Sequence, residues 1–339
     1  MSRRIRQFRG AIEAFSGAKI AVLGDFTADV YVYGKPHRVS REAPVVVARY
    51  ERESMVPGGA ANAVINLWAL GAKTLPVGVV GEDAEGRELV DQLIRRDIPV
   101  NGIARDPRSP TITKTRFMVG DAYAPTQQVF RIDHHADTLL QESAESTILE
   151  SLDKAAGEAD ALLVSDKAHS VLTEKVAARV REIAAAGKLV CVDSHARYDF
   201  LKGVRVVTPN QREAEYAAGI LARSEEDVVR LGFRLLELLE IAIAVITRGN
   251  QGMMLFEGGG SFTKIPVSNP DEVIDVTGAG DTVSSVLTLA LATGADPLTA
   301  ALLANHAAGM VVMQSGSRAV SAEDLLEAIL DWKEEGQGR

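Results

Sequence analysis

Hydrophobic positions along the chain form short continuous runs that alternate with longer segments of helical periodicity. Runs such as Leu162–Val164 and Leu189–Val192 contain no polar residue, which is typical of strands covered on both faces in a parallel sheet. Six strands are predicted on this basis: Lys19–Phe26, Pro76–Gly81, Asp160–Asp166, Lys188–Asp193, Arg205–Pro209 and Ile243–Arg248. Helices are predicted over residues 59–71, 84–96, 140–157, 170–186, 211–219, 224–240, 279–293, 297–314 and 321–333. Alternation of this kind favours an α/β fold with an open, mostly parallel sheet.

Two stretches in the first half break this alternation. Residues 30–50 and 111–132 read as β segments with turn residues and no helix, so we expect them to pair into a small antiparallel lid. The chain contains no long linker and no internal repeat, which favours one domain over residues 1–339 with a lid. Val45–Val47 gives the lid an apolar run. Because uncovered strand edges and apolar faces tend to associate, we expect a homodimer through the lid.

Composition narrows the class of protein. The 37 basic and 46 acidic residues leave a net charge of −9, which argues against a nucleic-acid partner. Cys191 is the single cysteine, so an intrachain disulfide is excluded and a reducing compartment is favoured. No apolar run is long enough for a membrane span, and the basic start is not followed by the apolar segment of a signal peptide. The prediction is a cytoplasmic protein without a membrane partner.

The most informative motif is Asp275–Thr282, with the sequence DVTGAGDT, which precedes an apolar helix. The small residues Gly278, Ala279 and Gly280 let the backbone approach a ligand, and their N–H groups open a helix N-terminus that suits an anion. Asp281 then lies beside that anion and is placed to accept a proton from an attacking hydroxyl. An acidic helix cap after a glycine turn has the same spelling.

Polar residues near the other predicted strands supply the acceptor side of a site. Gly58 and Gly59 open a helix that carries Asn62, whose amide suits a ligand with hydroxyl groups or simply faces solvent. Asp25 and Asp29 follow the first strand. Ligands of open α/β sheets bind beyond the carboxyl ends of strands, although aspartates are also common in turns.

Two further strand ends carry candidate phosphate and metal groups. Asn210 and Glu213 are three residues apart at a helix start, where they can hold Mg²⁺ through water or form a capping box. Thr247–Gly252 follows another strand and can approach phosphates or form a hairpin turn. Asn305 lies in a helix that is apolar nearly all round, so it needs a hydrogen-bond partner. A nucleotide edge and a backbone carbonyl are the alternatives.

Taken together, DVTGAGDT at 275–282 and the Gly58–Gly59 segment resemble the C-terminal and N-terminal signatures of the ribokinase-like (PfkB) family of carbohydrate kinases. The resemblance extends over residues 18–331. It implies a ribokinase-like open sheet sandwiched by helices with a small β-sheet lid. It also implies an ATP- and Mg²⁺-dependent sugar kinase, with a monovalent-cation requirement left open.

The family pattern implies a role for each matching residue. Asp281 corresponds to the catalytic base. The anion hole corresponds to Gly278, Ala279 and Gly280, and the sugar pocket to Asp29, Asn62, Gly58 and Gly59. The motif for Mg²⁺ and phosphate corresponds to Asn210 and Glu213. The nucleotide-phosphate loop corresponds to Thr247, Gly249 and Gly252, and the adenine side to Asn305.

One subgroup matches best. The spacing Gly-Gly-Ala-Ala-Asn at 58–62, together with the segments at 24–34, 38–47, 110–117 and 127–133, resembles the kinase domain of the ADP-heptose pathway enzyme. That kinase phosphorylates the C1 hydroxyl of D-glycero-β-D-manno-heptose 7-phosphate. The match implies contacts to the phosphosugar from four lid residues, Arg38, Lys114, Gln128 and Arg131.

The chain also departs from that subgroup. No His-x-Gly-His motif of a nucleotidyltransferase follows the kinase region, so we expect a stand-alone kinase with a separate nucleotidyltransferase acting after it. The segments DKAHS (166–170) and DSHARYDF (193–200) differ from the usual forms, and Lys167 is a candidate replacement for the usual lysine. The alternatives are another family kinase acting on a hexose, ketose or ribose, or a catalytically silent sugar-sensing member.

Overall fold

A computed structural model describes residues 3–121, 126–135, 140–169, 171–268, 275–313 and 319–331. Part of the predicted second lid segment (122–125), the first residue of the helix predicted over 170–186, and the ends of the helices predicted over 297–314 and 321–333 lie outside these residues. Within them, no helix is both long and apolar enough to cross a bilayer.

The central sheet has the strand order β12-β11-β10-β9-β8-β7-β1-β3-β4. All neighbours from β10 to β4 pair in parallel, and β11 and β12 add two antiparallel pairings at one edge. This arrangement confirms the predicted open, mostly parallel sheet. The strands are β1 (Lys19–Val39), β2 (Val46–Gly59), β3 (Lys73–Gly81), β4 (Ile103–Asp106), β5 (Ile112–Val119), β6 (Gln127–His134), β7 (Ala161–Asp166), β8 (Leu189–Ser194), β9 (Val206–Val207), β10 (Ile243–Thr247), β11 (Met253–Glu257) and β12 (Ser261–Ile265).

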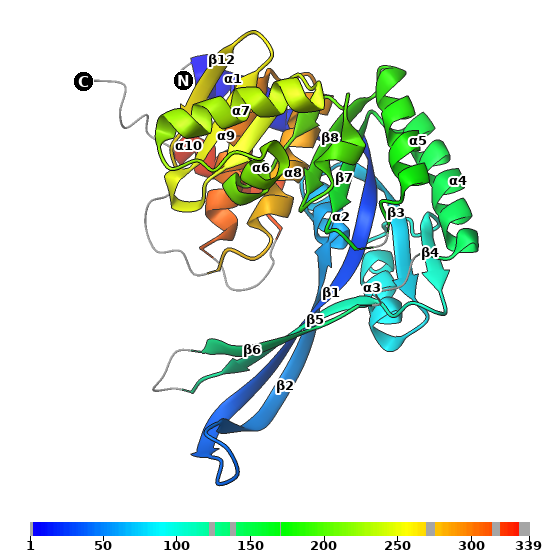
Figure 1. The fold of residues 1–339 in the computed structure, drawn as a ribbon, viewed down its shortest axis with the longest axis vertical. Helices are drawn as coiled ribbons and strands as arrows, with labels where there is room; N and C mark the ends of the chain where they lie inside the picture. The colour runs from blue at the N-terminus through cyan, green and yellow to red at the C-terminus, as the bar shows by residue number, and fades with distance from the viewer. Residues whose placement is uncertain are drawn as a thin grey trace.

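Helices cover both faces of this sheet (Figure 1). One apolar core packs the sheet against α1, α2, α3, α8, α9 and α10, and a second packs it against α4, α5, α6 and α7. Burial on both faces explains why the strands read as continuous apolar runs. The helices are α1 (Arg3–Glu13), α2 (Ala60–Ala69), α3 (Ala84–Ile94), α4 (Glu142–Glu158), α5 (Glu174–Ala185), α6 (Gln211–Ala218), α7 (Glu225–Leu239), α8 (Ala279–Ala292), α9 (Pro297–Val311) and α10 (Ala322–Asp331).

The lid grows out of the core through β1 (Figure 1). Residues Lys19–Asp25 of this strand pair with β3 in the core, whereas Phe26–Val39 pair with β2 in the lid. The hairpins β1–β2 and β5–β6 are antiparallel, but β1 and β5 pair in parallel. The prediction of an all-antiparallel lid is therefore wrong at this central pair. Both β1 and β5 run outward from the core, and β2 and β6 return, so the two outgoing strands must be parallel.

Among the described residues, one α-helix and three strands were not predicted from the sequence. Helix α1 buries Phe8 and Ile12 within a strongly basic segment, and its charge obscures the two apolar positions. Strand β4 has only four residues. Strands β11 and β12 continue antiparallel from β10 at the sheet edge, in the long connection left between the strand predicted at 243–248 and the helix predicted at 279–293. Short or edge elements of this kind have the weakest periodic signal.

Candidate active site

Polar side chains from several strand ends and from α8 meet at the carboxyl edge of the sheet. They surround a cavity of about 180 Å³ at the junction of the core and the lid. Ligands of open α/β sheets bind at this edge. The cavity is lined by Thr27, Asp29, Gly59, Lys114, Arg116, Lys167, His195, Thr277, Gly278, Gly280 and Asp281.

Asp281 is held by side chains from two distant parts of the chain. The Asn62 amide of α2 donates a hydrogen bond of 2.9 Å to its Oδ2, and the Lys167 ammonium lies 2.9 Å from its Oδ1. Gly278 stands at the N-cap position of α8 with φ of 81°, and no N-cap side chain caps this helix. The structure thus gives the Asp281 carboxylate partners other than those of a helix cap.

Lys167 connects Asp281 to a second acidic residue, Asp193. Its ammonium lies 2.7 Å from Oδ2 of Asp193 in β8. All three side chains are at most 10% exposed. Burial by itself lowers the pKa of Lys167, but attraction to Asp193 and Asp281 outweighs it and raises the pKa above its ordinary value. The lysine therefore stays protonated between the two carboxylates.

The N-terminus of α8 presents an open backbone beside Asp281. Gly278 takes a left-handed conformation that favours glycine. A Cβ added at Gly280 would meet no atom within 4 Å, so this backbone faces free space in the cavity. The first N–H groups of a helix have no partner within the helix, and together with the helix dipole they form an anion site.

The lid side of the cavity carries a buried ion pair. The Arg116 guanidinium donates to Oδ1 of Asp29 at 2.6 Å, and both side chains are at most 10% exposed. Burial lowers the pKa of Arg116, but Asp29 outweighs it and raises the pKa. Lys114 is the register partner of Asp29 across β1 and β5, which places it at the same end of the cavity.

Gly58 and Thr27 complete this acceptor side. A Cβ on Gly58 would lie 2.3 Å from Asp29 Oδ2 and 2.5 Å from Thr27 Oγ1, so only glycine fits there. The Thr27 hydroxyl is buried and has no hydrogen-bond partner among the described residues. A buried hydroxyl normally has a partner, and Thr27 is one of the residues that line the cavity. Thr27 is therefore a candidate contact to a ligand hydroxyl.

Asn210 and Glu213 form the capping box of α6. The Asn210 side chain accepts from the Glu213 N–H at 3.0 Å, and Glu213 Oε2 accepts from the Asn210 N–H at 2.8 Å. The capping box uses only Oε2 of Glu213. The other carboxylate oxygen, Oε1, lies 3.9 Å from His195 Nε2. Burial, with a further effect of Asp193, raises the pKa of Glu213 to about 7. A carboxylate buried beside another carboxylate suits a bound cation, so the capping box and a Mg²⁺ role are compatible.

The loop after β10 lies beside Asn210. A parallel bridge joins Asn210 to Thr247, so two predicted motifs are brought together. The loop also connects the antiparallel strands β10 and β11, as the alternative of a hairpin turn expected. Gly249 has φ of 56° with open space around it, whereas a Cβ on Gly252 would lie 2.1 Å from the Ile265 carbonyl oxygen. Gly249 therefore has an open side, and its approach to a nucleotide phosphate stays a prediction.

Asn305 has a backbone partner. Its amide donates to the Pro266 carbonyl at 2.8 Å, which is the alternative that the sequence left open. The residue holds the segment after β12 against α9, and a direct contact with adenine stays a prediction.

The four lid residues predicted to contact a phosphosugar are placed differently from one another. Lys114 lines the cavity. Arg131 is the register partner of Arg116 and forms an exposed ion pair with Asp133 at 2.8 Å. Arg38 pairs with Val47 near the far end of the lid, and Gln128 lies on the outer strand β6. Among the four, only Lys114 is in the lining of the cavity, and contacts from the others stay predictions.

Four residues that line the cavity were not among the predicted site residues: Thr27, Arg116, His195 and Thr277, the last of which lies inside the predicted motif at 275–282. Arg116 carried a usable signal, because it lies two positions after Lys114 in one strand and side chains two apart share a face. Thr27 and His195 had none, since their importance depends on contacts between segments far apart in the chain.

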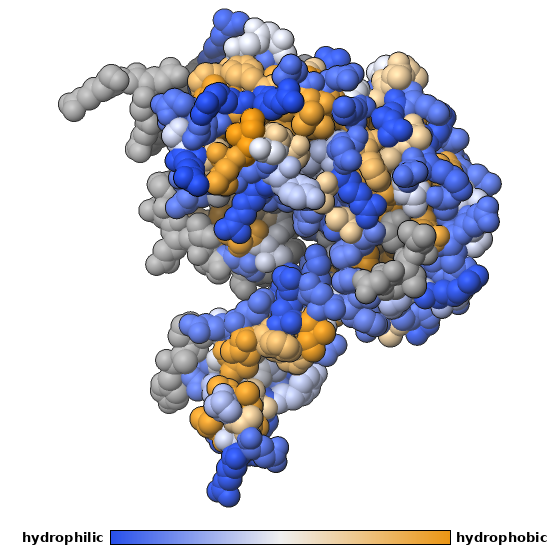
Figure 2. All heavy atoms as spheres, viewed as in Figure 1, coloured by the Kyte–Doolittle hydropathy of each residue, from blue (hydrophilic) through white to orange (hydrophobic). Residues whose placement is uncertain are grey.

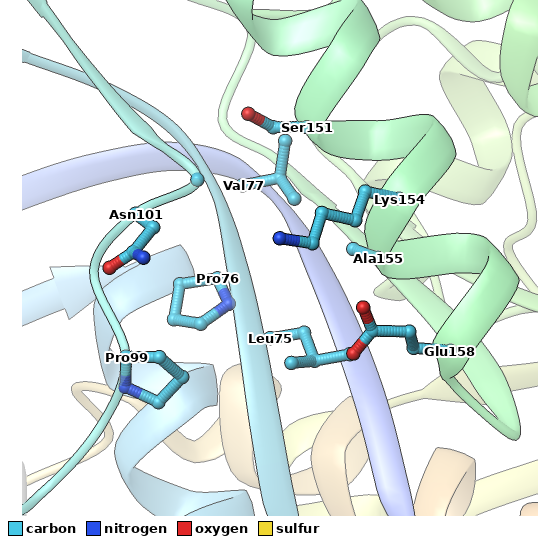
Figure 3. Close-up of a pocket in the computed structure, with 10 residues that line it drawn as sticks. Leu75, Pro76, Val77, Pro99, Asn101, Ser151, Lys154, Ala155 and Glu158 are labelled. Atoms are coloured by element: carbon cyan, nitrogen blue, oxygen red, sulfur yellow. The ribbon is translucent and has the colours of Figure 1, made fainter.

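A second cavity, of about 240 Å³, lies at the opposite end of the strands. Figure 3 shows its lining, with Lys154 and Glu158 from α4 and with Pro76, Pro99 and Asn101 from the β3 and β4 segments. It contains none of the residues around Asp281, so it is separate from the candidate active site.

Comparisons with known proteins show the family of the chain. Residues 18–324 match the model of the pfkB family carbohydrate kinases. The chain is 39% identical over 322 residues to the bifunctional protein HldE of Geobacter sulfurreducens, and 39% identical over 317 residues to HldE of a Caulobacter species. These alignments cover 94% and 92% of this chain but 63% of each relative. The chain thus spans less than two thirds of the length of these relatives.

Solved structures share the fold. Arabidopsis thaliana ribokinase complexed with ribose and ATP superposes with a TM-score of 0.72 at 19% identity, over 93% of this chain and 99% of that one. Escherichia coli phosphofructokinase-2 in complex with fructose-6-phosphate has a TM-score of 0.76 at 18% identity, over 93% of this chain and 98% of that one. The ribokinase-like fold predicted from the sequence is confirmed.

Proposed function

The chain belongs to the pfkB family of carbohydrate kinases, and from that premise we propose that it transfers a phosphoryl group from ATP to a sugar hydroxyl with Asp281 as the base. The observation that carries this proposal is the placement of Asp281. Its carboxylate is fixed by Asn62 and Lys167 at the mouth of a helix N-terminus whose backbone is open at Gly280. A base and an anion site side by side are what phosphoryl transfer to a hydroxyl needs.

The chemistry follows from these positions. Asp281 accepts the proton of the sugar hydroxyl while the hydroxyl oxygen forms a bond to the γ-phosphorus and the bond from that phosphorus to the ADP oxygen breaks. The N–H groups at Gly278–Gly280 stabilise the negative charge on the transferring group. Asp29 and Asn62 orient the sugar, and Thr27 offers a further hydroxyl contact. Each part acts from a residue that lines one cavity or contacts Asp281.

Nucleotide and metal positions extend from the same edge. The loop Thr247–Gly252 is proposed to approach the nucleotide phosphates and Asn305 to lie on the adenine side. Asn210 and Glu213 are proposed to hold Mg²⁺ through water. The donor set fits, because Glu213 keeps one carboxylate oxygen outside its capping box and is buried near Asp193. When bound, the metal neutralises phosphate charge.

For the substrate, we favour D-glycero-β-D-manno-heptose 7-phosphate, phosphorylated at the C1 hydroxyl. Support comes from the HldE relatives and from the subgroup motifs in the sequence. The cavity also offers positive charge for a phosphorylated sugar, since Lys114 lines it. The product class, a sugar with an anomeric phosphate, is what a nucleotidyltransferase consumes. Since the reaction needs ATP, the cytoplasm is the proposed location.

The test is ADP release with Mg·ATP across a panel of free and phosphorylated heptoses, hexoses, ketoses and ribose. The heptose 7-phosphate should give the highest kcat/KM. Lys114→Ala should raise KM for the 7-phosphate by about ten- to a hundredfold with a smaller effect on the free sugar. Arg131→Ala, which removes an exposed ion pair, should have the weaker effect. A wild-type preference for an unphosphorylated sugar would leave only the general kinase assignment.

The lid is the proposed dimer interface. Figure 2 shows hydrophobic side chains gathered along it, and the exposed ones include Val39, Val46, Phe130 and Ile132. We propose that the lid of a second copy of the chain covers these exposed apolar side chains. Light scattering at micromolar concentration should give a dimer, and Phe130→Asp with Ile132→Asp should give a monomer. A monomeric wild type would contradict the interface.

A further inference from the structure

Lys167 lies in a loop that is held by several backbone hydrogen bonds and contains a strained residue. It follows β7 directly, and the next residue, Ala168, has φ of 62°, a left-handed conformation that is strained for a residue with a Cβ. The buried Asp25 carboxylate accepts the N–H groups of Lys167, His169 and Val171 at 2.9, 3.3 and 3.2 Å. A loop held this firmly in a strained form points to a positional requirement of the residue it carries.

That requirement concerns the side chain. The ammonium bridges Asp193 and Asp281 at 2.7 and 2.9 Å, with 8% of the lysine side chain exposed. Asn62 occupies the other oxygen of Asp281. Because each carboxylate oxygen can accept two hydrogen bonds, Asp281 keeps a free lone pair for the sugar hydroxyl while its plane is fixed from both sides.

We propose that Lys167 is the positioning residue of the base: it sets the orientation of the Asp281 carboxylate and remains a cation throughout the transfer. This inference rests on the proposed kinase function. Lys167 neither gives nor takes a proton. The sugar proton moves to Asp281, and the ammonium keeps its ion pair with Asp193 after the charge of Asp281 is neutralised. The ammonium also lines the cavity with Gly280, so its positive charge lies on the side where the transferring phosphoryl group is expected.

Asp193 distinguishes this role from a purely structural one. If Lys167 served only to neutralise a buried carboxylate, its removal would be harmless once that charge was removed too. If it positions Asp281, removing both charges restores stability and leaves turnover low. The decisive variants are therefore Lys167→Met alone and Lys167→Met combined with Asp193→Asn, with Lys167→Arg as the variant that keeps the charge.

The experiment measures kcat, the two KM values and thermal unfolding for these variants with the best sugar of the panel. We expect Lys167→Met to lower kcat by about a hundredfold, the cost typical of a misplaced catalytic group, with KM for sugar and ATP within about threefold of wild type. The double variant should regain thermal stability but not kcat, and Lys167→Arg should recover part of kcat. Lys175→Met is the matched control, because Lys175 forms an ion pair with Glu145 at 2.7 Å on the surface and should leave kcat unchanged.

The outcomes separate the two proposals. If the wild type releases ADP with a sugar and the double variant has near wild-type kcat, the proposed role of Lys167 is overturned and the kinase assignment stands. A rise in KM for one substrate without a loss of kcat would also overturn it, because Lys167 would then be a binding residue. A wild type with no sugar-dependent ADP release would overturn the kinase assignment and this inference with it.

Discussion

Arg116 and Asp29 form an ion pair of 2.6 Å that is buried where the lid leaves the core. Removing one partner of such a pair leaves an uncompensated buried charge, which costs about 3–5 kcal/mol. Arg116→Met should therefore lower the free energy of unfolding by this amount and raise the KM for the sugar, since Asp29 loses its orientation.

Chemical denaturation and steady-state kinetics check this prediction. Combining Arg116→Met with Asp29→Asn should recover part of the stability but not the KM. Arg131→Met is the matched control, because its ion pair with Asp133 is exposed and is worth less than about 1 kcal/mol. Equal losses from Arg116→Met and Arg131→Met would show that burial of the pair has no consequence.

Asp281→Asn should keep the fold and lower kcat at least ~10²-fold, because loss of a general base typically costs 10²- to 10⁴-fold. Calorimetric titration should show sugar binding close to that of wild type. Asp296→Ala is the control for the helix-cap alternative. Asp296 caps α9 by accepting from the Thr299 N–H at 3.0 Å, so its loss should cost about 1 kcal/mol of stability without changing kcat. Near wild-type turnover in Asp281→Asn would remove Asp281 from its role.

Glu213→Gln should raise the Mg²⁺ concentration needed for half-maximal activity more than it changes the KM for the sugar. The amide can still accept from the Asn210 N–H, but it binds metal-coordinated water less well than a carboxylate. Asp227→Asn is the matched control, since Asp227 occupies the same position in the capping box of α7. Titrating Mg²⁺ at fixed ATP and sugar checks the shift. A loss of sugar affinity at unchanged Mg²⁺ dependence would assign Glu213 to the other side of the site.

These sites differ in how far the sequence could reveal them. The apolar runs predicted the core strands because burial on both faces leaves no polar residue, and DVTGAGDT placed Asp281 at a helix N-terminus, as the structure has it. The contacts of the Asp281 side chain could not be predicted from the sequence. Asn62 is 219 residues away from it, and only the folded sheet brings the β7 and β8 ends together around Lys167. The local pattern at Asn210 predicted either a capping box or a Mg²⁺ site, and the capping box is present.

The lid shows a different limit. Residues 30–50 read as β structure, but nothing local indicates that β1 passes from the core sheet into the lid without a break. The direction of β5 relative to β1 depends on where both strands leave the core. Pairing direction between segments distant in the chain has no signature in either segment alone, which is why the parallel pair β1–β5 was missed.

His306 should make stability depend on pH. Burial lowers its pKa to about 4, from an ordinary value near 6.5, and its ring packs against Phe8 of α1. Between these two values the unfolded chain binds a proton that the folded protein does not. The contribution of His306 is therefore full above pH 6.5 and is lost as the pH falls toward 4, by about 2 kcal/mol between pH 7 and pH 5.

Urea unfolding at pH 7 and pH 5 checks this sign. The loss should be about 2 kcal/mol smaller in His306→Gln than in wild type, whereas His37→Gln, which changes an exposed lid residue, should show the wild-type loss. Comparing the two variants removes the effect of other titrating groups. A His306→Gln protein with the full wild-type pH dependence would contradict the prediction.

Thr27→Val should separate stability from binding in opposite directions. Thr27 lines the cavity, and its hydroxyl is buried and has no partner among the described residues. Replacing it by a methyl group of similar size removes an unsatisfied polar group, so the free energy of unfolding should stay the same or rise. Because we expect this hydroxyl to contact a sugar hydroxyl, the same change should raise the KM for the sugar about three- to tenfold, the equivalent of one hydrogen bond.

Thr74→Val is the matched control, because Thr74 of β3 has a buried hydroxyl of the same kind and does not line this cavity. This change should alter stability without altering the KM for the sugar. Equal sugar KM values in wild type and Thr27→Val would show that the Thr27 hydroxyl does not contact the substrate.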